Sequence, residues 1–193
     1  MRVRVFDPLK LDMELFARDG AELSGTWPAA SLERLAEDAA PEAPASGWPE
    51  VTWSARGEER QPRGGEAQTW LHLQAGATVA LTCQRCLQPV RAALKLQRDF
   101  RFVRDEQLAI QLDADAEEDV LTLQRHMSLL ELVEDELLLA LPIVPRHQTC
   151  PKPLPMPIDD LDMPALEGEQ DGEKERKNPF AALAALKKTE PND

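Results

Sequence analysis

Residues 90–102, VRAALKLQRDFRF, decide the fold because apolar and polar side chains alternate along the whole stretch. The even-numbered positions are apolar, with the exception of Arg98, and the odd-numbered positions are mostly polar. A period of two is typical of a β-strand that turns one face to the core and the other to water. Because Arg98 interrupts the pattern, we expect a β-bulge or a sheet edge there.

Strand-like segments also precede this stretch. Ala75-Gly76 is interpreted as a turn between the last two of them. The connections between the segments are short, so antiparallel pairing is the simplest arrangement. The sequence therefore predicts a mostly antiparallel sheet from about Ala21 to Phe102. The strand-like segments are residues 21–27, 51–57, 67–74 and 78–83.

A helix is predicted at residues 128–142. Ser128 and Glu131 form a capping box at its start, and Pro142 ends it because proline cannot donate the next backbone hydrogen bond. Apolar residues recur at helical spacing on one side, which we expect to pack on the sheet. We interpret the acids as a polar face, since nothing near them in the sequence gives them a partner base or a metal. These acids are Glu131, Glu134 and Asp135.

Two further segments belong to the same predicted domain. Residues 31–38 predict a short helix that Ser31 caps. Residues 105–119 contain seven acids and no base, and we interpret them as a solvated loop. Together the patterns indicate an α+β fold, with a mostly antiparallel β-sheet core and a few packed helices, in one domain formed by residues 1–150.

The composition changes after Cys150. Residues 151–193 are acidic, rich in proline and poor in core-forming residues, so we expect a mostly disordered tail. The tail ends in residues 178–188, which have the pattern of a short amphipathic helix. A helix of this length is marginal alone in water, so we expect it to dock on its own domain or on a partner. Its apolar stripe is formed by Phe180, Leu183 and Leu186.

Charge and composition argue against several classes of protein. The formal net charge of the 193 residues is -13 at pH 7, which disfavours non-specific coating of nucleic acid or anionic membrane. Three cysteines, an odd number, do not make the disulfide framework of a secreted protein. The first residues do not resemble a signal peptide, and no apolar run approaches the length of a membrane span. We therefore expect a soluble cytoplasmic protein, with no membrane partner and no small-molecule substrate.

Cys83 and Cys86, three residues apart, indicate half of a metal site. Thiolates at this C-x2-C spacing bind zinc because both sulfur atoms can point to one tetrahedral centre. His147 and Cys150 are the other soft ligands in a compact group, and they would complete a Cys3His set for one zinc ion. Two reduced thiols in a hairpin remain the alternative interpretation. A redox pair is disfavoured, because the cysteines lie between strands and not at a helix N-terminus.

The stretch from Cys83 to Arg104 carries six basic residues and one acid in an otherwise acidic chain. Taken alone, this pattern is typical of a solvated strand face. The alternative is a basic stripe that contacts RNA phosphates or an acidic partner. The candidate binding residues are Arg85, Arg91, Lys95 and Arg101.

Three motifs follow one another along the chain: CQRCLQPV, then LVEDELLLALPIVPRH with a cysteine downstream, then KNPFAALAALKK. In order and spacing they resemble the YceD-like family, the large ribosomal RNA subunit accumulation proteins of bacteria and plastids. The resemblance covers nearly the whole chain. It implies a role in the synthesis, processing or stability of large-subunit (23S) rRNA. It implies no catalytic activity and supplies no catalytic residues.

Two classes of function remain open. The first is a non-enzymatic ribosome biogenesis factor, whose partners are the large-subunit rRNA precursor or ribosome assembly proteins. The second is a zinc- or thiol-dependent enzyme, or a small zinc-binding protein-interaction module. An enzyme needs a general base or an open metal position, and the sequence shows no Ser-His-Asp set, P-loop or H-E-x-x-H motif. The prediction is therefore the biogenesis factor, which is not an enzyme.

Overall fold

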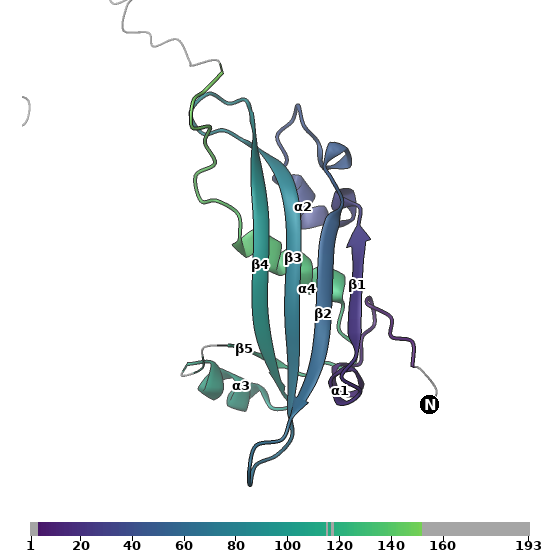
Figure 1. The fold of residues 1–193 in the computed structure, drawn as a ribbon. Helices are drawn as coiled ribbons and strands as arrows, with labels where there is room; N and C mark the ends of the chain where they lie inside the picture. Colours follow the sequence, from purple (N-terminus) through teal and green to yellow (C-terminus); the bar gives the residue numbers. More distant parts are fainter. Residues whose placement is uncertain (1–3, 115, 117, 152–193) are drawn as a thin grey trace, which may run out of the picture. The chain divides into compact units, whose positions relative to one another are not determined.

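The computed structural model describes residues 4–114, 116 and 118–151 (Figure 1). Its strands form one sheet in the order β1-β2-β3-β4-β5. Neighbouring strands from β1 to β4 are antiparallel, whereas β5 pairs parallel to β4. The strands are β1 (Glu22–Trp27), β2 (Val51–Arg60), β3 (Gln68–Thr82), β4 (Pro89–Val103) and β5 (Asp119–Thr122).

Helices flank this sheet, and the architecture confirms the predicted α+β fold with a mostly antiparallel core. Short 3-10 helices at Ala29–Ser31 and Ala45–Gly47 lie before and after α2. The predicted tail, with its short helix bearing Phe180, Leu183 and Leu186, lies outside the described residues except for Pro151. In the described part of the chain the α-helices are α1 (Met13–Arg18), α2 (Glu33–Glu37), α3 (Glu106–Asp113) and α4 (Leu129–Leu139).

The predicted alternation along β4 is confirmed by the burial of its side chains. Leu94, Phe100 and Phe102 on one face are buried in the core. Arg91 and Lys95 on the other face are exposed. A strand of this pattern stabilises the fold by removing one apolar face from water while the polar face keeps its hydration.

Arg98 lies at a sheet edge and not in a bulge. The register between β3 and β4 is continuous, and Arg98 lies opposite Leu73. The pairing of β4 with β5 begins at Phe100, so among the described strands none covers the outer edge of β4 at Arg98. From this edge the Arg98 Nε donates to the carboxylate of Glu136 on α4 at 3.1 Å. Although Arg98 points to the core-facing side of β4, its place at the edge lets the guanidinium contact both solvent and Glu136.

The predicted turn at Ala75-Gly76 is wrong, because β3 runs through it without a break. Gly76 pairs with Thr52 of β2 and with Lys95 of β4. A turn here would leave backbone groups of both neighbouring strands without hydrogen-bond partners. The two strands predicted on either side of it are therefore one strand. The turn predicted in residues 58–66 does occur, after Arg60, where Gly64 has a φ of 75° that favours glycine.

α4 packs against the core-facing sides of β3 and β4 (Figure 1). Its predicted cap is confirmed, since the backbone N–H of Glu131 donates to Ser128 Oγ at 3.3 Å. The helix ends at Leu139, before Pro142. Its fully buried apolar residues are Leu129, Val133 and Leu137.

α1, which the sequence did not predict, packs on β2 and β3. The Phe16 side chain of this helix is fully buried. A Cβ at Gly57 of β2 would lie 2.7 Å from the Phe16 carbonyl oxygen and 2.8 Å from the Ala17 Cα. Only glycine therefore allows the helix to approach the strand this closely.

The start of α2 is not capped by Ser31, whose Oγ donates to the Pro28 carbonyl at 2.7 Å. The backbone N–H groups of Arg34 and Leu35 donate instead to Oε1 of Glu134 on α4, at 2.7 and 3.2 Å. Glu134 is only 4% exposed, so its assignment to a polar face is also wrong. A carboxylate from a distant helix thus satisfies donors that a local side chain usually satisfies.

Residues 105–119 are not the solvated loop that their composition suggested, since they include α3 and the first residue of β5. The carboxylate of Asp105 caps α3 by accepting from the Leu108 backbone N–H at 2.8 Å. Asp113, at the end of α3, accepts from the Val120 backbone N–H at 3.1 Å. Some of these acids therefore accept hydrogen bonds from backbone N–H groups, and composition alone does not reveal such bonds.

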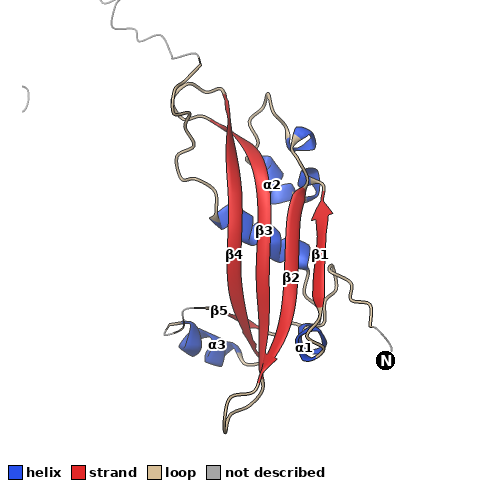
Figure 2. Cartoon of the chain, viewed as in Figure 1, coloured by secondary structure: helices blue, strands red, loops and turns tan. Residues whose placement is uncertain are grey.

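The face of β1 to β4 that points away from α4 is uncovered by any described helix (Figure 2), and we call it the open face. Polar side chains form cross-strand rows on it, because residues in register point the same way. One row contains Ser24, Ser54, Gln74 and Gln97, and the next contains Thr26, Thr52, Gly76 and Lys95.

Within the described residues, no helix is long and apolar enough to span a membrane.

Candidate metal centre and basic sheet face

The turn between β3 and β4 places Cys83 and Cys86 side by side. The backbone N–H of Cys83 donates to the Gln88 carbonyl at 3.0 Å, and that of Leu87 donates to the Cys83 carbonyl at 2.9 Å. Leu87 completes the turn with a φ of 59°, a left-handed conformation that is costly for a leucine. The tight turn directs both cysteine sulfur atoms to one side, as a C-x2-C metal half-site requires.

The segment that follows α4 brings His147 and Cys150 to this turn. The backbone N–H of Gln84 donates to the Pro145 carbonyl at 2.9 Å. The Arg85 Nη2 donates to the carbonyl of His147 at 2.7 Å and to that of Gln148 at 3.2 Å. Hydrogen bonds from the hairpin therefore fix the course of the segment on both sides of His147.

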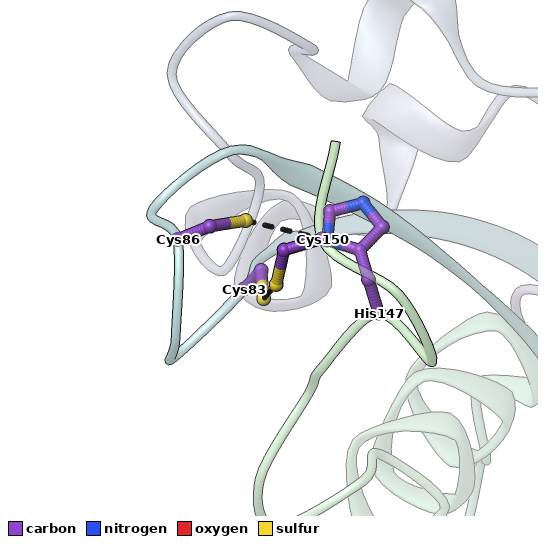
Figure 3. Close-up of side chains that lie close together, drawn as sticks. All are labelled: Cys83, Cys86, His147 and Cys150. Atoms are coloured by element: carbon purple, nitrogen blue, oxygen red, sulfur yellow. Dashed lines mark hydrogen bonds between the residues drawn. The ribbon is translucent and has the colours of Figure 1, made fainter. Parts of the chain in front are cut away.

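Cys83, Cys86, His147 and Cys150 converge, with four possible ligand atoms that all lie within 4.8 Å of one another (Figure 3). We call these four residues the Cys/His cluster. The two sulfur atoms of Cys83 and Cys150 are 4.0 Å apart, and the Cys86 sulfur lies 3.4 Å from His147 Nδ1. Around a tetrahedral zinc ion, pairs of sulfur ligands are about 3.8 Å apart and a sulfur and a nitrogen about 3.5 Å. The cluster can therefore hold a metal ion with little movement.

The His147 ring is oriented for metal binding. Its Nε2 lies 3.0 Å from the Pro89 carbonyl oxygen, and a carbonyl can only accept, so Nε2 carries the proton. In the neutral ring this leaves Nδ1, which faces Cys86, with a free lone pair. Metal-binding histidines commonly donate their other N–H to a carbonyl in this way.

The electrostatics of the cluster favour an ionised thiol at Cys83. Burial disfavours its thiolate, but backbone N–H groups of the hairpin and of His147 outweigh that cost and lower the Cys83 pKa to about 5. At Cys86, burial instead raises the pKa of the thiol. Zinc takes thiolates as ligands, so an ionised Cys83 is a ready first ligand, and the other thiols can release their protons as the metal binds.

Arg85 is part of this centre. Its Nε donates to the Cys150 sulfur at 3.0 Å, in addition to the two carbonyl contacts described above. Three thiolates around a bound Zn²⁺ would leave one net negative charge, which the adjacent guanidinium would offset. Four protein ligands would leave the zinc no open position, and such closed sites are structural.

The other basic candidates lie on β4, and they are not equivalent. Arg91 and Lys95 are both exposed on the open face, on the same side of one strand. Arg101 is on the same face but is half-buried, opposite the buried Trp70 of β3. Arg85 is tied to the Cys/His cluster. The structure therefore presents Arg91 and Lys95 as an exposed basic pair, and their binding role stays a prediction.

Charged contacts that sequence reasoning missed lie further along the open face. His72 lies between two carboxylates, with its Nδ1 at 2.6 Å from Asp99 and its Nε2 at 2.6 Å from Glu58. Glu58 also accepts from Arg60, at 3.1 Å. No local motif joins Glu58, His72 and Asp99, because they come from three different strands. Only the strand register, which depends on where the β2–β3 turn falls, could have revealed them.

A comparison with known families gives one result. Residues 71–187, more than half of the 193-residue chain, match the family model described as "Large ribosomal RNA subunit accumulation protein YceD". The matched range begins in β3 and includes the whole Cys/His cluster, β4 and α4. No solved structure was found to match the chain.

Proposed function

This chain belongs to the family of large ribosomal RNA subunit accumulation proteins YceD, and from that premise we propose a non-enzymatic, cytoplasmic ribosome biogenesis factor. The observation that carries the proposal is the family match, whose description implies a role in the accumulation of large-subunit rRNA. In this proposal the protein supports the synthesis, processing or stability of 23S rRNA. Its partners are the rRNA precursor of the large subunit or ribosome assembly proteins.

The proposed RNA contact runs through the exposed pair Arg91 and Lys95. With a net charge of -13, the whole chain is repelled by bulk phosphate, so a contact must be local. Among the described residues, no carboxylate forms an ion pair with either side chain. Both cations therefore remain available to phosphate oxygens.

The composition of the open face favours contact with the RNA backbone over base stacking. Proteins that bind unpaired bases usually present exposed aromatic side chains. Every aromatic residue in the described part of the chain is buried or half-buried. Hydroxyl and amide side chains near Lys95 can instead bond to phosphate and ribose oxygens. They include Thr52, Ser54, Gln74 and Gln97.

In the same proposal the Cys/His cluster binds one zinc ion in a structural role. The zinc would join the β3–β4 hairpin to the segment that follows α4. A zinc enzyme, the alternative considered above, needs a coordination position for water or substrate. A set of four protein ligands leaves none, which supports a factor without catalytic activity. We also propose that residues 1–150 fold as one domain and that the tail beyond them contributes a docking helix.

A strain that lacks the protein tests the function. We expect less mature large-subunit rRNA, or more of its precursors, with a smaller effect on small-subunit rRNA. The wild-type protein should restore the rRNA and comigrate with large-subunit precursor particles in a sucrose gradient. The double variant Arg91→Glu/Lys95→Glu should restore neither, although its melting temperature should stay close to that of the wild type.

The matched control is Lys10→Glu/Arg63→Glu, which changes the net charge equally at two other exposed cations. This control should behave like the wild type. If the folded Arg91→Glu/Lys95→Glu variant still binds the particle, the basic pair is not the contact. Unchanged rRNA in the deletion strain would reject the proposed function itself.

A further inference from the structure

Two contacts within the Cys/His cluster are especially short. Cys83 and Cys150 have their sulfur atoms 4.0 Å apart, and Cys86 faces the His147 ring at 3.4 Å (Figure 3). The three cysteines of the chain are all free thiols. One disulfide therefore uses two of them. All three sulfur atoms lie within 4.8 Å of one another, and the Cys83–Cys150 pair, at 4.0 Å, joins the hairpin to the distant segment.

The two sulfur atoms of the first pair differ in their access to solvent. Cys83 is fully buried, whereas Cys150 is partly exposed. Cys150 also receives a hydrogen bond from the Arg85 Nε at 3.0 Å. Partial exposure next to a cation is the environment in which oxidation-sensitive cysteines occur. A small oxidant that reaches the cluster meets Cys150 first.

We propose that Cys150 is an oxidation site for hydroperoxides and that Cys83 is its resolving thiol. The product is a Cys83–Cys150 disulfide that replaces zinc at the same place in the fold. This inference concerns the site to which the proposed function assigns zinc, but the disulfide itself forms with or without the metal.

The chemistry balances in two steps. The Cys150 thiolate attacks one peroxide oxygen, so an S–O bond forms, the O–O bond breaks, and hydroxide or alkoxide leaves. The product is a sulfenic acid at Cys150. The Cys83 thiolate then attacks that sulfur, an S–S bond forms, and hydroxide leaves and is protonated to water. The two thiolates supply the two electrons that reduce the peroxide, and a Zn²⁺ held by the cluster would need no change of oxidation state to be released.

The disulfide would make the same link that a bound zinc ion would make. Cys83 and Cys150 are 67 residues apart in sequence, so either bond closes the same long loop. Cys86 and His147 would be released from their ligand roles, because a disulfide leaves them without a metal to bind. Oxidation would thus exchange one cross-link for another and would leave the segment after α4 joined to the hairpin.

The test uses the full-length protein, purified under reducing conditions and loaded with zinc. Hydrogen peroxide is added stepwise, released zinc is measured with a chromogenic chelator, and the thiols are then alkylated and mapped by mass spectrometry. We expect zinc release in proportion to a Cys83–Cys150 disulfide, with Cys86 alkylated as a free thiol. Dithiothreitol and fresh zinc should restore the starting state.

Two variants make the assignment specific. Cys86→Ser should still form the Cys83–Cys150 disulfide. The double variant Cys83→Ser/Cys86→Ser, which has no second thiol within the cluster, should accumulate a Cys150 sulfenic acid that dimedone traps. Metal-free wild-type protein is oxidised in parallel, in case a variant fails to fold. A dominant Cys83–Cys86 disulfide, or Cys150 left reduced while other thiols oxidise, would overturn the inference. Absence of zinc in the starting protein would reject the zinc proposal alone, since the disulfide map is read independently.

Discussion

The buried Glu134 side chain joins two helices through several hydrogen bonds. Its Oε1 accepts from the backbone N–H groups of Arg34 and Leu35, and its Oε2 accepts from the Arg34 side chain at 3.0 Å. These contacts join α4 to the start of α2. A carboxylate in a buried position is stable only when several donors surround it, as they do here.

Replacing Glu134 with alanine should lower the free energy of unfolding by about 2 to 4 kcal/mol, because two backbone N–H groups lose their acceptor in a buried place. Glu134→Gln should cost about half as much, since an amide oxygen can still accept from both N–H groups. Urea denaturation measures the difference. The exposed Glu131 on the same helix offers the control, because Glu131→Gln should change stability by less than about 0.5 kcal/mol. Equal losses for Glu134→Ala and Glu131→Gln would contradict the capping role.

Glu58 should give the fold a specific pH dependence. Hydrogen bonds from Arg60 and then from His72 lower the Glu58 pKa from its usual 4.5 to about 2. A carboxyl group whose pKa is lower in the folded state stabilises the fold above its unfolded pKa. The contribution should therefore be complete above about pH 4.5 and be lost as the pH falls towards 2.

The measurement compares urea midpoints of the wild type and of Glu58→Gln at pH 6.5 and at pH 3. The variant should be less stable at pH 6.5, and the difference should shrink at pH 3. Glu59→Gln, at the exposed neighbouring position, should not show this convergence. A constant difference across the pH range would argue against the ionic contacts of Glu58.

At the scale of elements, the hairpin of β3 and β4 and the segment after α4 form one unit through the Cys/His cluster. If the cluster holds zinc, metal analysis should find about one zinc per chain in protein purified without chelator. Removal of the zinc should lower the melting temperature by an amount on the order of 10 °C, because an ion that binds only the folded state stabilises it. Differential scanning calorimetry with and without a strong chelator gives the shift.

His147→Ala should reproduce the chelator effect and become insensitive to chelator. His126→Ala, at an exposed histidine outside the cluster, should retain both the zinc and the melting temperature. Protein that contains well under one zinc per chain, with a melting temperature that chelator leaves unchanged, would support two reduced thiols in a hairpin instead.

Elements with a strong local period were predictable from the sequence. The alternation in β4 and the capping box of α4 correctly located those two elements. Three features were not predictable in this way. The Ala75-Gly76 pair has turn composition, but strands on both sides keep it extended. α1 is too short to show a clear period, and the acids around α3 conceal its helical pattern.

At the scale of the whole molecule, the antiparallel pairing of β2, β3 and β4 was predictable because short connections join these strands. The parallel pairing of β5 with β4 was not predicted. The candidate metal ligands were found from their spacing in the sequence. Whether the two pairs lie close together depends on the path of the chain after α4, which only the structure shows. Long-range polar contacts were the main failure. Arg98 with Glu136 and Arg34 with Glu134 join residues 38 and 100 positions apart, and neither pair has a local signature.

The long loop between Cys83 and Cys150 also has a consequence for synthesis on the ribosome. The strands β1 to β4 are complete once Val103 has been made, but α4, which covers their apolar side, ends only at Leu139. At about 5 to 20 residues per second, the part of the sheet that α4 covers stays exposed on the growing chain for several seconds. Cys150 comes later still, so no complete ligand set exists until the domain is nearly finished. Metal uptake would then be the last stage of folding. In a chain that stalls before Cys150, α4 could pack on the sheet, but the segment after α4 could not yet be joined to the β3–β4 hairpin through zinc.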